Sequence, residues 1–584
     1  MEKSNRVRIS DWCKRTFGIL LLLYLQQFQL TCGLRVAKRL ILMEPGWVLL
    51  NMLIVACPYL LLYLITGRRT IAIAVNGILC TLFSLINYHV LVYHGSPFFA
   101  QDIHSIKTAV EVAGGYKFLF RLTTLSSLVI FLVEMVLFLW LIKRKIPLHE
   151  KKARLAAGIK SAVCICGLYL LFFSPIALFQ NNLITWSWEQ EVLTYGYGVC
   201  FCNSLYSLSH VIIEPEGYQE EMIQEQKAKV EDCTTPDIIL ILNETLCDIS
   251  VYADVPESRE LFRQMEEIPG VIAGQAISPM VGGGTNDTEF ELLTSCSTSL
   301  LSMSAPFTTM SMEGIDNVVA WLKEYQYSTT AMHCRLASNY SRNRAYKDLG
   351  FDQLILGQEN FRYFSTNGNR ECLDSDNYKD LLEQYDQAGD NPRMMYLLTF
   401  QNHGGYDQNE PEEDSIKTEM DYQAYTQEVN EYLSSIAYSV SAFQELIRTL
   451  DAQERPVVVL MVGDHAPSFL SDLPAKEGIT DREAEICLRT VPYYIWSNQP
   501  LDTSCLSKNA SMTDMLPMVL AAANMPRSAF HETVLQLNQT LPVRLKSGIC
   551  MDNRSQIIEL GNDPEYEQLL KNYQYLEYQM LTSQ

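Results

Sequence analysis

Four short apolar runs in the C-terminal part of the sequence are each followed by side chains that can bind a metal ion or a phosphate group. The runs cover residues 238–242, 328–333, 394–400 and 457–462. Glu244 follows the first run, His333 ends the second, His403 follows the third, and Asp464 and His465 follow the fourth. One strand-end histidine would usually be structural, but four converging ends are harder to assign to packing. Carboxylates together with histidine suit a divalent cation such as Mn²⁺, Mg²⁺ or Zn²⁺.

A glycine-rich segment supplies a candidate nucleophile for such a site. Residues 281–291 read Val-Gly-Gly-Gly-Thr-Asn-Asp-Thr-Glu-Phe-Glu, and the pattern predicts a helix that begins near Thr285. The dipole and the free N–H groups of a helix N-terminus favour an alkoxide there, and a metal contact would lower the pKa of the hydroxyl further. The alternative is that Thr285 only caps the helix, with Thr288 or Glu289 completing the turn. The segment alone favours neither interpretation.

The elements that must position these residues form an α/β pattern. A fifth apolar run covers residues 491–496, and the runs alternate with helical stretches such as 314–325 and 422–450. Strands that alternate with helices predict a mixed, mostly parallel sheet with helices on both faces. Ligands of such sheets bind beyond the carboxyl ends of the strands, which is where the candidate residues lie.

Charge and hydropathy divide the chain into two parts. The 584 residues carry a net charge of −22 and have a mean hydropathy of +0.01. Residues 1–183 hold 20 Lys and Arg against 7 Asp and Glu, and residues 184–584 hold 25 against 60, so the net charges are +13 and −35. A nucleic-acid-binding protein would need a basic face, so the overall charge argues against that class. The basic part is also the apolar part, which predicts a membrane domain followed by a water-soluble one.

Five apolar segments of the basic part are candidate membrane spans, each of which needs about 20 residues. They cover residues 17–34, 47–65, 71–93, 122–142 and 161–179. A signal peptide is the alternative for the first, but no small-residue cleavage site follows it. Lys and Arg gather at the N-terminus, after the second span and after the fourth, which predicts that these segments are cytoplasmic and the C-terminal part is extracellular.

The predicted organisation is a five-span transmembrane domain at 1–183, a connector at 184–235 and an extracellular domain at 236–584. Glu134 lies inside the fourth span. A carboxylate in a membrane is a functional candidate. The alternative, which we favour, is a neutral or paired side chain that faces other helices.

Five sequence motifs occur in an order and spacing that are specific in combination. They are Ile-Leu-Asn-Glu-Thr at 241–245, Gly-Gly-Gly-Thr-Asn-Asp-Thr-Glu-Phe at 282–290, Ser-Arg-Asn-Arg-Ala-Tyr-Lys-Asp-Leu-Gly-Phe-Asp at 341–352, Gln-Asn-His-Gly-Gly-Tyr at 401–406 and Val-Gly-Asp-His-Ala-Pro at 462–467. Through them the chain resembles the lipoteichoic acid synthase family, within the alkaline phosphatase and sulfatase-like superfamily. The resemblance runs through the whole chain. It implies a helical membrane domain joined to an extracellular α/β domain of the alkaline phosphatase/sulfatase-like fold.

The resemblance implies a metal site and a nucleophile. The family's ligands of a single Mn²⁺-type ion correspond to Glu244, Thr285, Asp464 and His465. Mg²⁺ and Zn²⁺ are the alternative ions. Thr285 also corresponds to the nucleophile that takes up the phosphoalcohol group.

The resemblance implies substrate contacts as well. The positions that bind phosphoglycerol correspond to His333, Arg342 and His403. His403 either protonates the leaving oxygen or binds a phosphate oxygen. Tyr340 stands where the best-known members carry Trp, so the contact to glycerol is altered, and Arg344 is an additional basic residue near Arg342.

The activity that the resemblance implies is transfer of a phosphoglycerol group from a phosphatidylglycerol-like membrane phospholipid, through a phosphothreonine, to a glycolipid or polyglycerolphosphate-type acceptor. The enzyme would sit in a bacterial cell membrane with its catalytic domain outside. A phosphoethanolamine transferase is the alternative enzyme, although its Thr segment is normally Cys-flanked. A catalytically inactive membrane sensor or transport protein with a binding ectodomain is the non-enzymatic alternative. A true sulfatase would need a C-x-P-x-R motif, which the sequence lacks.

Overall fold

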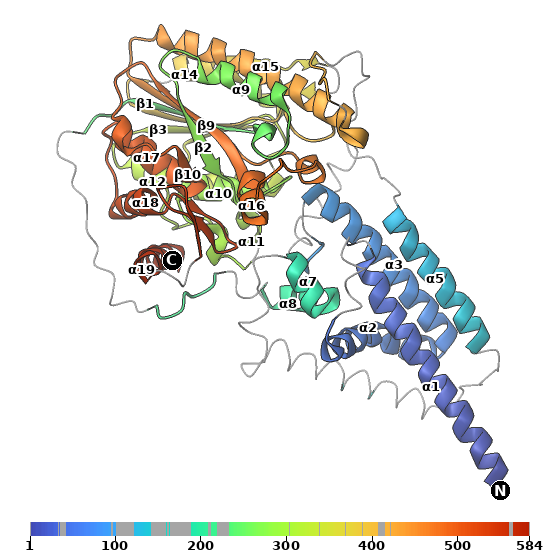
Figure 1. Cartoon of the computed structure of the whole chain (residues 1–584). Coiled ribbons are helices and arrows are strands. Elements are labelled where there is room, and N and C mark those ends of the chain that lie inside the picture. Colours follow the sequence, from blue (N-terminus) through green and yellow to red (C-terminus); the bar gives the residue numbers. More distant parts are fainter. Residues whose placement is uncertain are drawn as a thin grey trace. The chain divides into compact units, whose positions relative to one another are not determined.

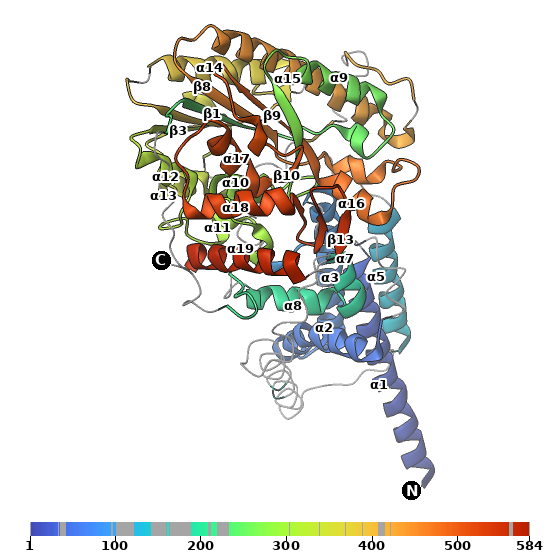
Figure 2. The ribbon, with the colours of Figure 1, turned by 60° about the vertical axis from the view of Figure 1, so that its left-hand side comes forward.

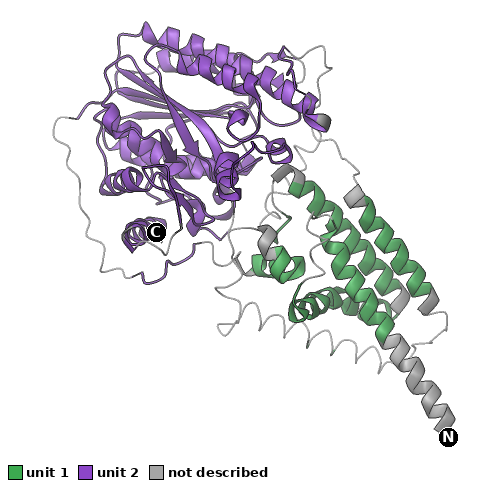
Figure 3. Ribbon diagram, viewed as in Figure 1, with its two compact units in different colours: residues 1–103, 117–210 green, residues 104–116, 211–584 purple. Residues whose placement is uncertain are grey.

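The chain divides into two compact units, each with its own hydrophobic core (Figure 3). Unit 1 comprises residues 1–103 and 117–210, and unit 2 comprises residues 104–116 and 211–584. The computed structural model describes residues 2–32, 34, 43–94, 97–100, 122–141, 159, 163, 188–207, 212–218, 233–302, 304–337, 339–367, 370–387, 389–406, 415–420, 422–559 and 564–582. The predicted boundaries at residues 183 and 235 stay predictions.

The described part of unit 1 is helical (Figure 2). Its helices are α1 (Glu2–Thr31), α2 (Pro45–Thr66), α3 (Arg69–His94), α5 (Leu122–Leu141), α7 (Trp188–Tyr195) and α8 (Tyr197–Ser207). Two stretches are long and apolar enough to cross a membrane: α2, with a mean hydropathy of 2.4, and Ile71–Leu91 within α3, with 1.8. These lengths fit the thickness of the hydrocarbon layer.

The predicted count of five spans is not reached. Among the described residues, two helices meet the requirement for a span. The predicted spans at 17–34 and 122–142 correspond to the shorter apolar stretches Phe17–Thr31 and Leu125–Leu139, each under 18 residues. The predicted span at 161–179 and most of the basic turn before it lie outside the described residues.

Unit 1 places polar side chains inside its helix bundle and apolar side chains outside. Glu134 of α5 is fully buried, and its carboxylate accepts a hydrogen bond from Gln26 Nε2 of α1 at 3.3 Å. Gln26 Oε1 in turn accepts one from Asn76 Nδ2 of α3 at 2.8 Å. Leu132 and Leu139 of α5 are 62% and 65% exposed. This distribution is expected of helices whose outer face meets lipid, and Glu134 is the paired, inward-facing side chain that we favoured.

Unit 2 is built on an eight-stranded sheet with the order β10-β2-β9-β8-β1-β7-β3-β4 (Figure 1). The strands are β1 (Asp237–Asn243), β2 (Ile272–Ile277), β3 (Ser328–His333), β4 (Gln353–Leu356), β7 (Arg393–Leu398), β8 (Val457–Gly463), β9 (Thr490–Ser497) and β10 (Asn509–Ser511). β9 runs antiparallel to both of its neighbours, and all other neighbouring pairs are parallel. The predicted mixed, mostly parallel sheet is therefore confirmed.

Helices cover both faces of this sheet, as the two views of the molecule show (Figures 1 and 2). One face carries α9 (Pro256–Glu266), α14 (Asp374–Gln387) and α15 (Thr426–Asp451). The other face carries α10 (Thr285–Thr294), α12 (Val318–Lys323), α17 (Met515–Ala522) and α18 (Ala529–Thr540).

The remaining elements of unit 2 are short, apart from the last helix. The helices are α11 (Pro306–Thr309), α13 (Arg342–Asp348), α16 (Asp481–Arg489) and α19 (Pro564–Thr582). The strands are β5 (Thr366–Asn367) and β6 (Arg370–Glu371), which form a two-stranded sheet, and β11 (Val543–Arg544), β12 (Ile549–Met551) and β13 (Ile557–Glu559), which form a three-stranded one.

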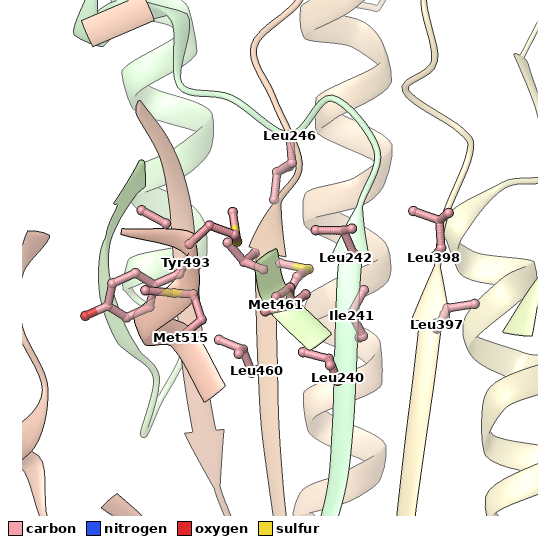
Figure 4. Close-up of a cluster of buried hydrophobic side chains, with 14 of the residues drawn as sticks. Leu240, Ile241, Leu242, Leu246, Leu397, Leu398, Leu460, Met461, Tyr493 and Met515 are labelled. Atoms are coloured by element: carbon pink, nitrogen blue, oxygen red, sulfur yellow. The ribbon is translucent and has the colours of Figure 1, made fainter. Parts of the chain in front are cut away.

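The centre of the large sheet is a rigid platform for the loops at its carboxyl end. β1 and β8 are buried along their whole length, which is why their sequences are continuous apolar runs. Leu240 pairs with Leu460 and Ile241 with Met461, and their side chains lie in one buried cluster (Figure 4). Each fully buried side chain of this size contributes about 1.5–3 kcal/mol.

Candidate active site

Three of the predicted metal ligands lie together at the carboxyl ends of two neighbouring strands. Glu244 follows β1, and Asp464 and His465 follow β8. All three side chains are buried, and their ligand atoms lie within 4.8 Å of one another. β1 and β8 are parallel neighbours, so their carboxyl ends share one edge of the sheet.

The donor atoms of this group fit a divalent cation. His465 Nδ1 lies 3.0 Å from the carbonyl oxygen of Ala466, so Nδ1 carries the proton and the lone pair of Nε2 is free for a metal. Nε2 lies 3.3 Å from Asp464 Oδ2 and 3.7 Å from Glu244 Oε1. Asp464 Oδ2 is buried and makes no hydrogen bond to the described residues. An acceptor in that state suits a metal ion.

Electrostatics argue in the same direction. Burial and the nearby Asp464 carboxylate raise the pKa of Glu244 well above its ordinary value. Two buried carboxylates at this separation destabilise each other unless a positive charge lies between them. A divalent cation would supply that charge and hold both groups ionised.

Hydrogen bonds to the backbone and a close contact fix the relative position of the two loops that carry the predicted metal ligands. Asp464 Oδ1 accepts hydrogen bonds from the backbone N–H of Thr245 at 2.6 Å and of His465 at 2.7 Å. Gly463 packs against the chain after β1, because a Cβ atom there would lie 2.0 Å from the carbonyl oxygen of Leu246. Only glycine fits at that position.

The glycine-rich loop brings the start of α10 next to these ligands. Gly282 N–H donates to the carbonyl oxygen of Ala466 at 2.9 Å, and Thr288 Oγ1 donates to that of Asp464 at 3.0 Å. α10 begins at Thr285, as predicted, and all ten of its residues are buried. The N-cap is Gly284, with a φ of 87°, so Thr285 is not the capping residue. The capping role considered for Thr285 is therefore not observed, and its role as ligand and nucleophile stays a prediction.

Arg342 lies at the start of α13 and is 4% exposed. Its guanidinium donates two hydrogen bonds to Glu289 Oε2, from Nε at 2.9 Å and from Nη2 at 2.7 Å. Tyr340 lies against it, with the guanidinium carbon 5.0 Å from the ring centroid. Tyr340 and Ser341 both have positive φ values, 51° and 55°. Such strained backbone is typical of functional sites.

The two predicted substrate-binding histidines follow the neighbouring strands β3 and β7: His333 is the last residue of β3, and His403 lies in the loop after β7. His333 is buried, and its Nδ1 lies 3.0 Å from the carbonyl oxygen of Leu398. Burial, and then the charge of Arg342, lower the pKa of His333 well below its ordinary value, so it is neutral. The ring of His403 stacks on Phe400 with a centroid distance of 4.6 Å. Arg344, by contrast, donates to the carbonyl oxygen of Phe307 at 2.8 Å, so the additional basic residue has a structural contact.

Comparison with known proteins identifies the part of the chain that carries these residues. Residues 236–525 match the Sulfatase family. They form a sulfatase-family domain. The superfamily expected from the motifs is thereby confirmed for this part of the chain, whereas membership of the lipoteichoic acid synthase family stays a proposal.

Individual relatives are distant. A putative cyclic beta-1,2-glucan modification protein of Rhizobium meliloti (strain 1021) is 23% identical over 381 residues, which are 62% of this chain and 58% of that protein's length. The Neisseria meningitidis integral membrane protein lipooligosaccharide phosphoethanolamine transferase A (EptA) is 15% identical, with 87% of this chain and 95% of that chain covered and a TM-score of 0.50. The Streptococcus pyogenes phosphoglycerol transferase GacH, in complex with sn-glycerol-1-phosphate, is 18% identical, with 63% and 95% covered and a TM-score of 0.48. The likeness to EptA shows that the fold is shared across most of the chain.

The sulfatase-family domain also holds functional candidates that sequence reasoning missed. Glu289 stands in a motif that we quoted, but nothing in the sequence pairs it with Arg342, 53 positions away. Arg335 lies over the Phe400 ring at 4.3 Å, on which His403 stacks. Asp374 is buried below the strand ends, where it accepts hydrogen bonds from Asn243 at 2.8 Å and Ser439 at 2.7 Å. No motif or spacing signal pointed to these contacts.

Asp374 makes the stability of the sulfatase-family domain depend on pH. Burial raises the pKa of Asp374 to about 6, from 3.8 in an exposed side chain. The folded state therefore binds the proton of Asp374 more tightly than the unfolded state does. The contribution of Asp374 to the free energy of unfolding consequently falls as pH rises from about 4 to about 6. We expect Asp374→Asn to gain stability relative to the unsubstituted protein across this interval, by about 3 kcal/mol at most. Thermal unfolding of the full chain at both ends of the interval measures the difference.

The control for this substitution is Asp386→Asn, on the exposed part of the same helix. It should leave the stability difference between pH 4 and pH 6 as it is in the unsubstituted protein. If Asp374→Asn and the unsubstituted protein differed by the same amount at both pH values, the assignment of a raised pKa to Asp374 would be wrong.

Proposed function

We propose that this protein is a metal-dependent phosphoglycerol transferase. It would take the headgroup from a phosphatidylglycerol-like membrane phospholipid onto Thr285 and pass it to a glycolipid or polyglycerolphosphate-type acceptor at the bacterial cell surface. The observation that carries the proposal is that α10, which begins at Thr285, contacts both the chain that carries the buried group of Glu244, Asp464 and His465 and the buried Arg342.

The first half of the reaction forms a covalent phosphothreonine. Thr285 gives up its hydroxyl proton as Oγ attacks the phosphorus of the lipid diester, the bond from phosphorus to the diacylglycerol oxygen breaks, and that oxygen takes up a proton. Arg342 holds a non-bridging phosphate oxygen through the guanidinium N–H groups that do not bind Glu289. His403 protonates the leaving oxygen or binds a phosphate oxygen, and neutral His333 donates or accepts a hydrogen bond without adding charge. A cation bound by Glu244, Asp464 and His465 would lower the pKa of the Thr285 hydroxyl and offset charge on phosphate oxygens.

The second half returns Thr285 to its starting state. An acceptor hydroxyl attacks the phosphothreonine, the bond from phosphorus to Thr285 Oγ breaks, and Thr285 regains a proton. Mn²⁺ is the ion that we propose for the site, with Mg²⁺ and Zn²⁺ as alternatives, because carboxylate and imidazole donors suit all three.

The apolar helices of unit 1 support a membrane lipid as the donor. Diacylglycerol stays in the bilayer, so an enzyme that releases it must work at the membrane surface. The apolar helices α2 and α3 and the outward-facing leucines of unit 1 suit such an anchor. We propose a multi-pass membrane protein with its sulfatase-family domain outside the cell.

Two features bear on the alternatives. The sequence around Thr285 reads Gly-Gly-Gly-Thr and lacks flanking cysteines, which favours phosphoglycerol over phosphoethanolamine as the transferred group. The Rhizobium meliloti relative is described as a putative cyclic beta-1,2-glucan modification protein, so a surface glucan is included among the acceptors to be tested. An intact set of charged and nucleophilic residues argues against an inactive sensor.

The proposal is tested by incubating the purified full chain with Mn²⁺ and headgroup-labelled phosphatidylglycerol or phosphatidylethanolamine. We expect diacylglycerol release and a glycerol phosphate adduct on the protein, both detected by mass spectrometry, only with phosphatidylglycerol. Release from phosphatidylethanolamine instead would establish the alternative enzyme. Release from neither lipid, with Mn²⁺ bound, would contradict both.

A further inference from the structure

Glu289 is a buried carboxylate whose two oxygens face different parts of the domain. Oε2 accepts both hydrogen bonds from Arg342. Oε1 accepts a hydrogen bond from the hydroxyl of Tyr396 on β7 at 3.2 Å and another from the hydroxyl of Tyr346 on α13. Glu289 is fully buried, and Arg342, Tyr346 and Tyr396 are each less than 5% exposed. One carboxylate therefore joins the nucleophile helix, the arginine helix and the centre of the sheet.

The contact uses one edge of the guanidinium and leaves the other. Arginine carries five N–H donors in a fixed plane. Nε and one N–H of Nη2 are turned toward Glu289, and Nη1 makes no hydrogen bond to any residue in the described part of the chain. Because the guanidinium plane is rigid, fixing one edge also fixes the direction in which the Nη1 edge donates.

The spacing on α10 places the same carboxylate in register with the nucleophile. Thr285 and Glu289 are four residues apart on one helix, so their side chains lie on the same face, one turn apart. α10 is buried over its whole length, which leaves it little freedom to shift. The position of Arg342 is thereby set relative to Thr285 through one short, rigid connection.

We propose that Glu289 is a positioning residue that holds the Arg342 fork in line with Thr285, so that a phosphate oxygen bound by Nη1 presents its phosphorus to Thr285 Oγ. The inference rests on the proposed function and adds to it a residue that touches neither the substrate nor the three clustered metal-ligand candidates. Its effect should fall on turnover, because a misplacement of about 1 Å in such a site lowers turnover on the order of 10²-fold.

Two substitutions separate this role from a purely structural one. In Glu289→Gln the side-chain oxygen can still accept from the tyrosines, but the amide group then faces the Arg342 donors and repels them. Tyr396→Phe is milder, since it removes one donor to Oε1 and keeps the aromatic packing. The matched control is Glu260→Gln, which disrupts an exposed pair with Arg263 on α9.

The experiment is a double-mutant cycle with Arg342→Ala in the full chain. Diacylglycerol release from phosphatidylglycerol gives kcat and KM, and titration calorimetry measures binding of sn-glycerol-1-phosphate and of Mn²⁺. We expect Glu289→Gln to lower kcat on the order of 10²-fold and Tyr396→Phe to lower it by about 3-fold to 10-fold, with Mn²⁺ affinity unchanged in both. In the Arg342→Ala background each should cause less than a twofold further loss, because residues that act as a unit are not additive.

Contrary outcomes are distinct. Two results would overturn the inference. One is a Glu289→Gln substitution that lowers kcat by the same factor in the Arg342→Ala background as in the unsubstituted protein; the other is a kcat for Glu289→Gln within twofold of the unsubstituted protein. If Glu289→Gln fails to fold, the same comparison is made with Tyr396→Phe in the presence and absence of Arg342→Ala. Thr285→Ala is measured alongside: full activity in that variant overturns the proposed function, whereas an inactive Thr285→Ala with a fully multiplicative cycle overturns only the positioning role.

Discussion

Replacement of Thr285 by alanine should lower diacylglycerol release by at least about 10³-fold, because the substitution removes the oxygen that would form the proposed covalent intermediate. The rest of the site should persist. α10 is capped by Gly284 and held by Thr288, so its start does not depend on the Thr285 hydroxyl. Steady-state release measures the rate, and intact-protein mass spectrometry after mixing with phosphatidylglycerol should show an adduct on the unsubstituted chain alone.

The matched control is Thr294→Ala at the other end of the same helix. Thr294 Oγ1 is used only within the fold, as a donor to the carbonyl oxygen of Phe290 and an acceptor from Cys296 N–H. Its loss should reduce stability by about 1 kcal/mol and keep both the adduct and the activity. An adduct that persists in Thr285→Ala would place the nucleophile elsewhere and remove the basis of the mechanism.

The second large effect is expected at Asp464. Asp464→Asn removes the charge of the carboxylate whose Oδ2 lies closest to His465 Nε2, while the amide oxygen can still accept the two backbone N–H groups at Oδ1. We expect Mn²⁺ affinity to fall by at least about 10²-fold, together with activity, because a neutral ligand replaces a charged one. Binding of Mn²⁺ at 100 times its Kd stabilises the fold by about 2.7 kcal/mol. A chelator should therefore lower the Tm of the unsubstituted protein and leave that of Asp464→Asn unchanged.

Asp472→Asn controls for the loss of a charge in the same loop. Asp472 lies eight positions further along and accepts a hydrogen bond from Tyr425 at 2.8 Å, outside the metal-ligand group. Its variant should bind Mn²⁺ normally and keep the effect of the chelator. Tight Mn²⁺ binding by Asp464→Asn would show that the cation lies elsewhere in the chain.

The strands at the centre of the sheet could be predicted from the sequence, and those toward its edges could not. β1, β7 and β8 are buried on both faces and therefore read as uninterrupted apolar runs. β2 was missed because its sequence, Ile-Ala-Gly-Gln-Ala-Ile, contains Gly274 and Gln275 and is only partly buried. β4 and β10 have four and three residues, too few to show a period. The direction of β9 was not visible either, since a buried strand reads alike in both directions.

The same distinction applies to the site. The residues at strand ends could be predicted to lie together, because the carboxyl ends of parallel strands meet at one edge of the sheet for any conformation of the loops. Glu289 and Asp374 could not, because their partners lie 53 and 131 positions away on other elements. Only the folded structure brings Arg342 of α13 to Glu289 of α10. The sequence predicts what chemistry a side chain can perform, but it does not predict which side chains from other elements lie next to it.

The complete burial of α10 has a consequence for the order of events. Under the proposed function, a nucleophile on a helix that is buried along its whole length has little freedom to move between separate donor and acceptor sites, so we expect both substrates to occupy the same site next to Thr285 in turn. Diacylglycerol would have to depart before the acceptor enters, which is double-displacement kinetics. Reciprocal plots of rate against donor at several acceptor concentrations should then give parallel lines, and excess acceptor should compete with the lipid for the free enzyme.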